Sequence, residues 1–501
     1  VQIGDPITQK KLSDFIYEAR EKLLYRFITD NGAGGLSSSI GEMSSHCGGC
    51  RLDLKKAPLK YAGLDPWEIL LSEAQERMSF AVSPEKINEF LEIAKKRDVD
   101  ATVLGEFTNS GKFHILYGEK TVACLDLSFL HNGLPRMKLK AKWKEPVYSE
   151  PEFKNRSFSD DFIEMLGRLN ICSNEYKARQ YDHEVKGISV IKPFTGIERD
   201  VQNDATVFMT EPMSKEGVVL SSAILPGYSD IDTYHMMASV IDLAVRRTVA
   251  TGGDPNHTAG LDNFCWPDPV QSAKTPDGEY KLAQLVRANK ALSEYTIAFG
   301  VPCISGKDSM KNDSTRGGKK ISIPPTVLFS TVSKIKDISK AITPYAKLAG
   351  DLIYVVGVTY PELGGSEYFR MLSAIGNNVP KVNAKFAVKI CKLMHKAIMQ
   401  ELVHSVYAPG SGGLAVGFAK IAIGGRLGLE INLSEIPSKD CESAHEILFS
   451  ESNSRFIVTI HEKNRAEFEA LFSKIPHKKI GKVIQNQELA IIDQKNEKLI
   501  I

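Results

Sequence analysis

The chain has 501 residues, of which 25% are charged and 43% hydrophobic, and its formal net charge is +2. This length exceeds one ordinary hydrophobic core, so we expect about three domains. The near-neutral charge gives no electrostatic reason to expect binding to nucleic acid or a membrane, and no apolar run approaches the ~18 residues that span a bilayer. The eight cysteines indicate free thiols in a cytoplasmic protein rather than a disulfide framework.

An internal duplication organises the sequence. Residues 32–36 read GAGGL and residues 410–414 read GSGGL, an offset of 378. At the same offset, LLSEAQERMSFAV (70–82) aligns with LFSESNSRFIVTI (448–460). Neither segment is of low complexity, so we interpret them as two copies of one structural unit.

Both copies have the same predicted order of elements. In the first copy these are a helix over 12–27, a glycine turn, a helix over 35–43, a strand at 51–54, a loop ending at Pro58, a strand carrying Ser72 and Glu73, and a helix starting at Ser83-Pro84. In the second copy the first helix covers 384–403, the second covers 413–423, and the loop ends at Pro437.

The residues between the copies differ from both. Residues 146–184 are polar and are predicted to form an irregular linker. The next segment has predicted helices over 233–251 and 280–299, followed by a strand-like VPCIS and a turn at 306–309. Mixed helices and strands of this kind are typical of an α+β fold built from α/β layers.

A carboxylate precedes the glycine turn of the first copy, where Asp30 stands before the sequence Asn-Gly-Ala-Gly-Gly. Glycines let backbone amides approach an anion, and a helix N-terminus favours phosphate. Asp30 is therefore a candidate Mg²⁺ ligand, although a capped turn without a ligand fits the motif equally well. At the offset of 378 Asp30 aligns with Ala408, so only one copy keeps the carboxylate. This asymmetry is expected if only one copy serves a working site.

Polar residues beside the second strand are further candidates. Glu73 and Gln75 would lie on one face of a strand and could bind ribose hydroxyls or a substrate amide. Arg77 is shared with the second copy as Arg455, which favours a structural ion pair with a glutamate. Gln75 becomes Asn453, which favours a functional role for Gln75.

Two short motifs remain open in function. The Gly306–Ser309 segment does not have the spacing of a Walker A loop, but it could form another phosphate-and-metal turn with Asp308 on Mg²⁺. Cys47 and Cys50 form a lone CxxC, for which free thiols are favoured over zinc because structural zinc takes four ligands. The six other cysteines are predicted to be core residues.

Several segments together resemble the phosphoribosylformylglycinamidine synthase family. They are QIGDP (2–6), DNGAGGL (30–36), PLKYAGLDPWEILLSEAQERM (58–78), QYDH (180–183), GLDNFCWPDP (260–269) and SGKDSMKN (305–312). The resemblance implies tandem aminoimidazole ribonucleotide synthetase-like A and B domains. Residues 1–145 would be the first B domain, 146–184 a linker, 185–340 the second A domain and 341–501 the second B domain. The first A domain and the general base of the family would lie outside this chain, which we expect to be a C-terminal part.

The resemblance also implies an activity, cofactors and partners. The family is an ATP-dependent ligase of purine synthesis that converts formylglycinamide ribonucleotide and ammonia into formylglycinamidine ribonucleotide. ATP and Mg²⁺ are the implied cofactors. The chain has no glutaminase signature, so ammonia would come from a glutaminase subunit or domain, with a small accessory subunit as a further implied partner. The alternative is a non-catalytic scaffold or assembly module that holds a structural nucleotide.

The resemblance also implies site residues, each at a position of this sequence that matches a position of the family's motifs. They are Gln2, Glu73, Ala74, Gln75 and Ser309 for the substrate, Asp262, Gly306 and Lys307 for the nucleotide, and Asp30 and Asp308 for the metal. The resemblance further implies that the Gly306–Ser309 turn belongs to the same site as Asp30 and Glu73.

Overall fold

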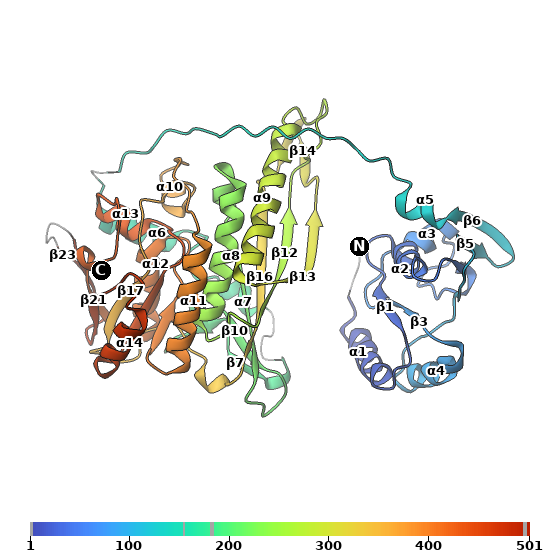
Figure 1. The fold of residues 1–501 in the computed structure, drawn as a ribbon, viewed down its shortest axis with the longest axis horizontal. Coiled ribbons are helices and arrows are strands. Elements are labelled where there is room, and N and C mark those ends of the chain that lie inside the picture. The colour runs from blue at the N-terminus through green and yellow to red at the C-terminus, as the bar shows by residue number, and fades with distance from the viewer. Residues whose placement is uncertain (1–3, 154–155, 181–184, 494–497, 501) are drawn as a thin grey trace. The chain divides into compact units, whose positions relative to one another are not determined.

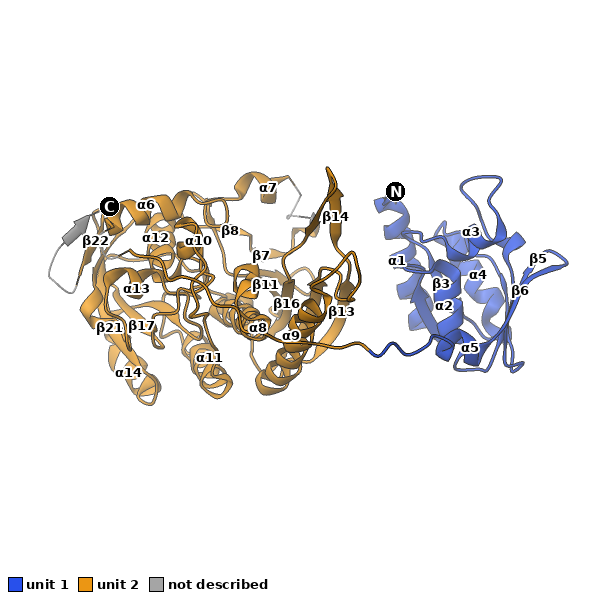
Figure 2. Cartoon of the chain, turned by 90° about the horizontal axis from the view of Figure 1, so that it is seen from above, with its two compact units in different colours: residues 1–138 blue, residues 139–501 orange. Residues whose placement is uncertain are grey.

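The computed structural model describes residues 4–153, 156–180, 185–493 and 498–500. The chain divides into two compact units, Val1–Lys138 and Leu139–Ile501, hereafter unit 1 and unit 2 (Figure 2). The boundary between the two units lies near residue 145, where the first domain was predicted to end. The domain boundaries predicted at 185 and 341 remain predictions. Among the described residues, no helix combines the length and apolar character needed to cross a bilayer.

Unit 1 holds two small sheets and the helices around them. Its elements are α1 (Pro6–Glu21), β1 (Phe27–Asp30), α2 (Gly35–Ser44), β2 (Cys50–Asp53), α3 (Pro66–Leu71), β3 (Met78–Ala81), α4 (Ile87–Lys96), β4 (Gly105–Phe107), β5 (Lys112–Tyr117), β6 (Lys120–Asp126) and α5 (Leu127–Asn132). One sheet pairs β1 with β3, and the other has the order β4-β2-β5-β6. The core is divided as well, since α1 and α4 enclose one apolar cluster and α2 and α3 cover another.

The first helix lies earlier in the sequence than the predicted 12–27. Pro6 occupies the first turn of α1, where its fixed φ and missing N–H are tolerated. The chain leaves the helix at Leu23, which adopts a left-handed φ of 55°, and Phe27 already begins β1. The predicted helix was therefore placed six residues too late, which is about 1.7 helical turns.

The prediction that Ser72 and Glu73 lie on a strand is wrong. Asp65, Pro66 and Glu68 form a capping box with proline in the first turn, and this starts α3. Ser72 is the C-cap of that helix, and Glu76 takes a left-handed φ of 55°. The segment 73–77 is consequently a loop, and β3 begins only at Met78.

The first part of unit 2 is a six-stranded sheet in the order β13-β12-β16-β11-β10-β7. These strands are β7 (Ser189–Ile191), β10 (Thr206–Met209), β11 (Gly217–Ile224), β12 (Thr258–Cys265), β13 (Cys303–Ser309) and β16 (Thr326–Ile335), with the ribbons β8 (Phe194–Thr195)–β9 (Val201–Gln202) and β14 (Asp313–Arg316)–β15 (Lys319–Ser322) beside them. The helices α8 (Thr233–Ala250) and α9 (Gly278–Phe299) pack together against the sheet (Figure 1). Both helices confirm their predictions.

The second copy is a seven-stranded sheet in the order β18-β20-β17-β21-β19-β22-β23. Its elements are β17 (Leu352–Val356), α10 (Glu367–Met371), α11 (Ala384–Met399), β18 (Ser405–Tyr407), α12 (Gly413–Gly425), β19 (Gly428–Asn432), α13 (Ala444–Phe449), β20 (Phe456–Ile460), α14 (Arg465–Phe472), β21 (His477–Ile484), β22 (Leu489–Ile492) and β23 (Lys498–Ile500). Successive residues of β17 point to opposite faces, so one set packs with α11 and α14 and the other with α12 and α13.

The predicted irregular linker at 146–184 contains two helices, α6 (Phe158–Gly167) and α7 (Glu175–Arg179). Ser157 caps α6 by accepting a hydrogen bond from the backbone N–H of Asp160. Phe162 and Met165, spaced by three residues, are buried in the core of the second copy. The polar composition of the segment concealed this short amphipathic pattern.

All eight cysteines are free thiols, as predicted. The prediction that those outside the CxxC are core residues holds for Cys391, which is buried, but it is wrong for Cys124 and Cys303. Cys124 lies on β6 and Cys303 on β13, which are the edge strands of their sheets. Both are exposed, because an edge strand has no neighbour on one side.

Candidate functional site

The Asp30 turn of unit 1 is held against the loop that follows α3. The Oδ1 atom of Asp30 accepts a hydrogen bond from the N–H of Gly32 at 2.8 Å. A Cβ added at Gly35, whose φ is 55°, would lie 2.3 Å from the carbonyl oxygen of Ser72. The N–H of Ala74 donates to the carbonyl oxygen of Asn31 at 3.2 Å. The glycine turn therefore brings the N-terminus of α2 and the loop 73–77 into direct contact.

A buried polar triad lies beneath this turn. The hydroxyls of Ser39 on α2 and Ser79 on β3 donate to Asn31 Oδ1, at 2.7 and 3.1 Å. Asn31 Nδ2 in turn donates to the carbonyl oxygen of Arg77 at 3.2 Å. These three residues were not predicted, although their counterparts at the offset of 378 are Pro409, Gly417 and Ile457, which cannot make the same bonds.

The loop 73–77 carries three of the predicted substrate residues. Glu73 and Gln75 are exposed and Ala74 is half-buried. Arg77 donates from Nη2 to the carbonyl oxygen of Ser72 at 2.5 Å. Among the described residues Arg77 forms no ion pair, so the predicted pair with a glutamate is wrong and the arginine supports the loop through its backbone. Gln2 lies outside the described residues.

The second copy repeats this scaffold closely. Gly412 and Gly413 have φ of 79° and 65°, and a Cβ at Gly413 would lie 2.6 Å from the carbonyl oxygen of Ser450. Arg455 Nη2 donates to that same carbonyl oxygen at 2.7 Å. Ser454 has a left-handed φ of 56°, as Glu76 has in unit 1. The two segments thus fold alike, which supports the interpretation of the sequence as a duplication.

The counterpart of Glu73 in the second copy has a different environment. Glu451 is buried, and its Oε2 accepts a hydrogen bond from the hydroxyl of Tyr228 at 2.5 Å. Its Oε1 accepts from the N–H groups of Gly412 and Glu367, each at 2.9 Å. Burial raises the pKa of Glu451 to about 7, since removal from water penalises the charged form. This carboxyl group joins segments of the chain rather than facing a cavity.

A second buried network joins α8 to the second copy. Arg246 donates from Nε to Asp242 Oδ2 at 2.5 Å and from Nη1 to the carbonyl oxygen of Pro409 at 2.8 Å. Asp242 also accepts bonds from the N–H and hydroxyl of Ser454, at 3.0 and 2.8 Å. The predicted helix over 233–251 gave no signal for this buried ion pair. Its burial is tolerated because each charged group has several partners.

The predicted turn at 306–309 is instead the end of the edge strand β13. β13 runs parallel to β12, with Asp262 opposite Gly306 and Cys265 opposite Ser309. Because side chains alternate along a strand, Asp308 lies on the same face as Gly306 and opposite to Lys307. The structure therefore does not bring Lys307, Asp308 and Ser309 together on one turn. Gly306 had been predicted to be a turn residue, which is wrong.

The packing of Asp262 against β13 explains why residue 306 is a glycine. A Cβ at Gly306 would lie 3.2 Å from Asp262 Oδ2, so glycine leaves room for this carboxylate. Burial and the nearby Asp308 raise the pKa of Asp262. Although Cys303 is exposed as a residue, partial desolvation of its thiol and the neighbouring Asp262 raise the pKa of Cys303 to about 11, which disfavours its thiolate. Ser309 exchanges hydrogen bonds with the side chain of Asn312, at 3.0 and 3.2 Å.

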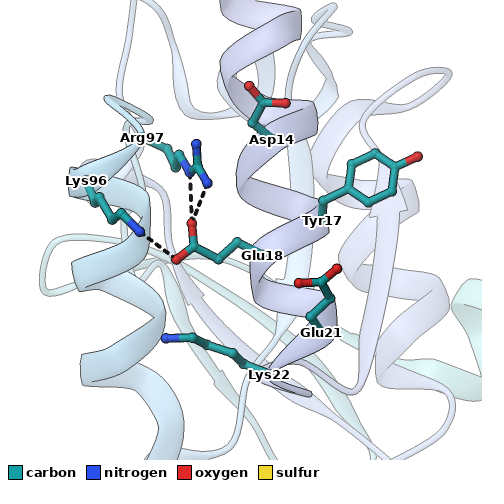
Figure 3. A pocket seen from close by; sticks show the side chains of 7 residues that line it. All are labelled: Asp14, Tyr17, Glu18, Glu21, Lys22, Lys96 and Arg97. Carbon is teal, nitrogen blue, oxygen red and sulfur yellow. Dashed lines mark hydrogen bonds and ion pairs between the residues drawn. The ribbon is translucent and has the colours of Figure 1, made fainter. Parts of the chain in front are cut away.

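The described residues contain no group of three or more His, Cys, Asp or Glu side chains arranged to hold a metal ion. A surface hollow between α1 and α4 contains none of the predicted site residues (Figure 3). Glu18 lies at its centre and pairs with Lys96 at 2.8 Å and Arg97 at 2.7 Å. These contacts tie the two helices together, so we assign the hollow a structural role.

Comparison with known proteins places these features in a family. A family model described as AIR synthase related protein, C-terminal domain, matches residues 1–118 and 349–494. The phosphoribosylformylglycinamidine synthase subunit PurL of Thermococcus sibiricus is 32% identical over 501 residues, covering 100% of this chain and 66% of the relative. The same subunit of Methanothermobacter marburgensis is 31% identical over 466 residues, covering 92% and 61%. The chain thus spans less than two thirds of the length of these curated relatives.

Solved structures agree on the fold. Thermotoga maritima PurL complexed with AMPPCP matches with a TM-score of 0.64 at 22% identity, over 96% of this chain and 69% of the other. The same protein complexed with FGAR matches with a TM-score of 0.64 at 21% identity, over 97% and 66%. The chain belongs to the AIR synthase related protein family, and both copies of its duplicated segment carry the C-terminal domain of that family.

Proposed function

We propose that this chain is part of a phosphoribosylformylglycinamidine synthase, an ATP-dependent ligase of purine synthesis. In this reaction ATP activates the formamide oxygen of formylglycinamide ribonucleotide, and ammonia derived from glutamine displaces that oxygen to give the amidine. The observation that carries the proposal is the first copy of the duplication. It combines Asp30, a glycine turn and the exposed Glu73 and Gln75 on one contiguous surface of unit 1.

The Asp30 turn fits a phosphate-bound Mg²⁺ ion. Asp30 is exposed at the end of β1, and only its Oδ1 is engaged by Gly32 among the described residues. The N–H groups of Ala33 and Gly34 form no hydrogen bond to other described residues, so they are available to phosphate oxygens. Mg²⁺ prefers carboxylate and phosphate oxygens, and the N-terminus of α2 adds a favourable dipole. Asp30 would hold the metal, while the turn would bind the phosphates.

The loop beside this turn suits the substrate. Glu73 and Gln75 offer a carboxylate and an amide that can hydrogen-bond ribose hydroxyls or the formamide group. Gln2 and Ala74 belong to the same proposed substrate set. Ser309 is proposed to contact the substrate as well.

The remaining assignments concern β12 and β13. Asp262, Gly306 and Lys307 are proposed nucleotide contacts, and Asp308 is a proposed metal ligand beside Asp262. A glutaminase subunit or domain and a small accessory subunit are proposed partners, and the cytoplasm is the proposed location.

Reconstitution tests the proposed activity. The isolated chain with ATP, formylglycinamide ribonucleotide and ammonium should form no product, because the general base of the family is expected in a domain outside these residues. The full-length protein should form formylglycinamidine ribonucleotide under the same conditions. Product formation by the isolated chain would contradict the need for a further domain. Inactivity of the full-length protein with ammonium would contradict the ligase proposal itself.

A second candidate is a scaffold that holds a structural nucleotide. The second copy supports it, because Glu451 is buried and Ala408 replaces the metal carboxylate. Nucleotide released by acid from the purified chain, at one molecule per chain and without turnover in the full-length protein, would favour this candidate over the ligase.

A further inference from the structure

Asn31 connects the two parts of the candidate site in unit 1. It follows Asp30 directly, and only 1% of its surface is exposed. Its backbone N–H and its Nδ2 atom both donate to the carbonyl oxygen of Arg77, at 3.3 and 3.2 Å. Its own carbonyl oxygen accepts a hydrogen bond from the N–H of Ala74 at 3.2 Å. Asn31 is therefore bonded near both ends of the loop 73–77.

The side chain of Asn31 is held by two hydroxyl groups. Ser39 and Ser79 both donate to Asn31 Oδ1, and their oxygen atoms lie 3.0 Å apart. Ser39 belongs to α2 and Ser79 to β3, so the amide is held from two elements. All three residues are buried, with exposed fractions of 7% or less. Hydrogen bonds from two elements leave a buried amide little freedom to rotate.

The second copy joins the same two places with a different residue. The counterpart of Asn31 is Pro409, which has neither a backbone N–H nor a side-chain amide. Arg246 of α8 replaces it, since its Nη1 atom donates to the carbonyl oxygens of Pro409 at 2.8 Å and Arg455 at 3.2 Å. Arg455 is the counterpart of Arg77. The contact between turn and loop is thus kept in both copies, and in unit 1 it is made from within the unit.

The network sets the spacing between two groups with different proposed functions. On one side of Asn31 is Asp30, the proposed Mg²⁺ ligand, and on the other is the loop with Glu73 and Gln75. This loop contains a left-handed residue, Glu76, whose φ is 55°. Transfer between a bound phosphate and a bound substrate needs the reacting atoms about 3–3.5 Å apart, and a displacement of about 1 Å can lower the rate about a hundredfold.

We propose that Asn31 is a positioning residue that sets the distance between the Mg²⁺ and phosphate site at Asp30 and the substrate loop 73–77. Ser39 and Ser79 hold its amide in the orientation that this connection requires. The inference rests on the proposed function, because that function assigns ATP to one side of Asn31 and the formamide substrate to the other. Loss of the amide should leave each side able to bind its own ligand and should change the distance between the two ligands.

Hydrogen exchange on the 501-residue chain tests the connection itself. In Asn31→Ala the amide of Ala74 should exchange about tenfold faster or more, because the loop then opens locally at lower cost. The matched control is Ile93→Val, which removes one carbon from the separate cluster between α1 and α4. It should change exchange at Ala74 less than about twofold, since that amide opens locally. Unchanged exchange at Ala74 in Asn31→Ala would overturn the inference.

Kinetics of the full-length protein test the consequence for the reaction. Asn31→Ala should lower kcat about tenfold, because the two ligands are held at the wrong distance. KM for ATP and for formylglycinamide ribonucleotide should each change less than about threefold, because the groups that bind them are retained. Ile93→Val should keep kcat within about twofold despite its loss of stability. Equal changes of kcat in the two variants would contradict the positioning role.

A milder variant, Ser79→Ala, keeps the test decisive if Asn31→Ala does not fold. It removes one of the two donors to Asn31 Oδ1 and should lower kcat about threefold with little change in KM. An unchanged kcat in Ser79→Ala would overturn the role of the network. Absence of turnover by the unmodified full-length protein would instead overturn the ligase proposal, and with it the role of Asn31 in the reaction. The exchange experiment would still decide whether Asn31 joins the turn to the loop.

Discussion

The two copies of the duplicated segment share a scaffold and differ in their polar surface. Gly35 and Gly413 allow the same close approach to a carbonyl oxygen, and Arg77 and Arg455 donate to the same loop position. In contrast, the carboxylate of Asp30 becomes Ala408. Residues that hold the backbone are retained, whereas the carboxylate of Asp30 is lost and the retained glutamate, Glu73 or Glu451, is exposed in one copy and buried in the other.

The glutamates Glu73 and Glu451 differ in the free-energy cost of removing their carboxyl groups from water. Glu73 is exposed, whereas Glu451 is buried with three hydrogen-bond donors around it. A buried carboxyl group without donors would cost several kcal/mol, so the donors are what permit its burial. One copy thus presents its glutamate to solvent, and the other uses it to join Tyr228 and α10 to the glycine turn.

The largest expected effect is at Asp30, the proposed Mg²⁺ ligand. In the full-length protein Asp30→Ala should lower kcat about a hundredfold or more, because a lost Mg²⁺ ligand on a polyphosphate removes several kcal/mol of transition-state stabilisation. The matched control is Ala408→Ser in the second copy, which should change kcat less than about twofold. Steady-state rates over a Mg²⁺ titration provide the measurement. Similar losses of kcat in both variants would contradict the proposal that only the first copy serves the active site.

A smaller effect is expected where the copies are alike. Gly35→Ala and Gly413→Ala should each destabilise their own unit by ~2–4 kcal/mol, because both combine a left-handed φ with a clash against a carbonyl oxygen. Gly63→Ala is the control, since Gly63 has a φ of 84° but no atom within 4 Å of the added Cβ. It should cost only ~1 kcal/mol. Chemical denaturation measures all three, and equal costs at Gly63 and Gly35 would refute the close approach.

The buried glutamate predicts a pH dependence of unit 2. The pKa of Glu451 is raised to about 7 in the folded state, so the folded protein binds a proton there that the unfolded chain releases. The stability from this group is present at acid pH and declines as pH rises toward 7, by up to about 1.4 kcal/mol per pH unit. Glu451→Gln should remove this slope between pH 5 and 7, while Glu73→Gln should leave it in place. Denaturation at several pH values measures the slope, and an unchanged slope in Glu451→Gln would count against the protonated group.

The smallest effect is expected at the triad of unit 1. Asn31→Ala should lower the unfolding free energy of unit 1 by about 1–2 kcal/mol, because it leaves the buried hydroxyls of Ser39 and Ser79 without their shared acceptor. The control is Ser38→Ala, whose side chain makes only an exposed contact at 3.3 Å. Equal unfolding free energies in the two variants would show that the triad does not stabilise the turn.

The sequence was most informative where a local signal repeats. Gly34 and Gly35 mark the start of α2, and the same glycines at 412 and 413 mark α12, so the duplication was predicted correctly. The helix predicted over 233–251 is present as α8, and most of its residues are buried. Asp30 was placed correctly before the turn, because β1 ends at that residue.

Predictions failed where two local signals compete. Pro66 and its capping box start a short helix that ends just before Ser72 and Glu73, which were predicted to lie on a strand. Gly306 suggested a turn, but β13 continues through it, and a Cβ at this position would lie 3.2 Å from Asp262 Oδ2. The buried pair Asp242 and Arg246 gave no signal, since their burial depends on Ser454 and Pro409 far along the chain.

The sequence alone determined the duplication, the glycine turns, the two long helices and the loss of the carboxylate at Ala408, because each depends on neighbouring residues or on one alignment. Only the tertiary structure decided that Glu451 is buried while Glu73 is exposed, and that the described strands of unit 1 form two separate sheets. Burial and strand pairing depend on contacts between residues far apart in sequence, and no local pattern encodes which partners are present.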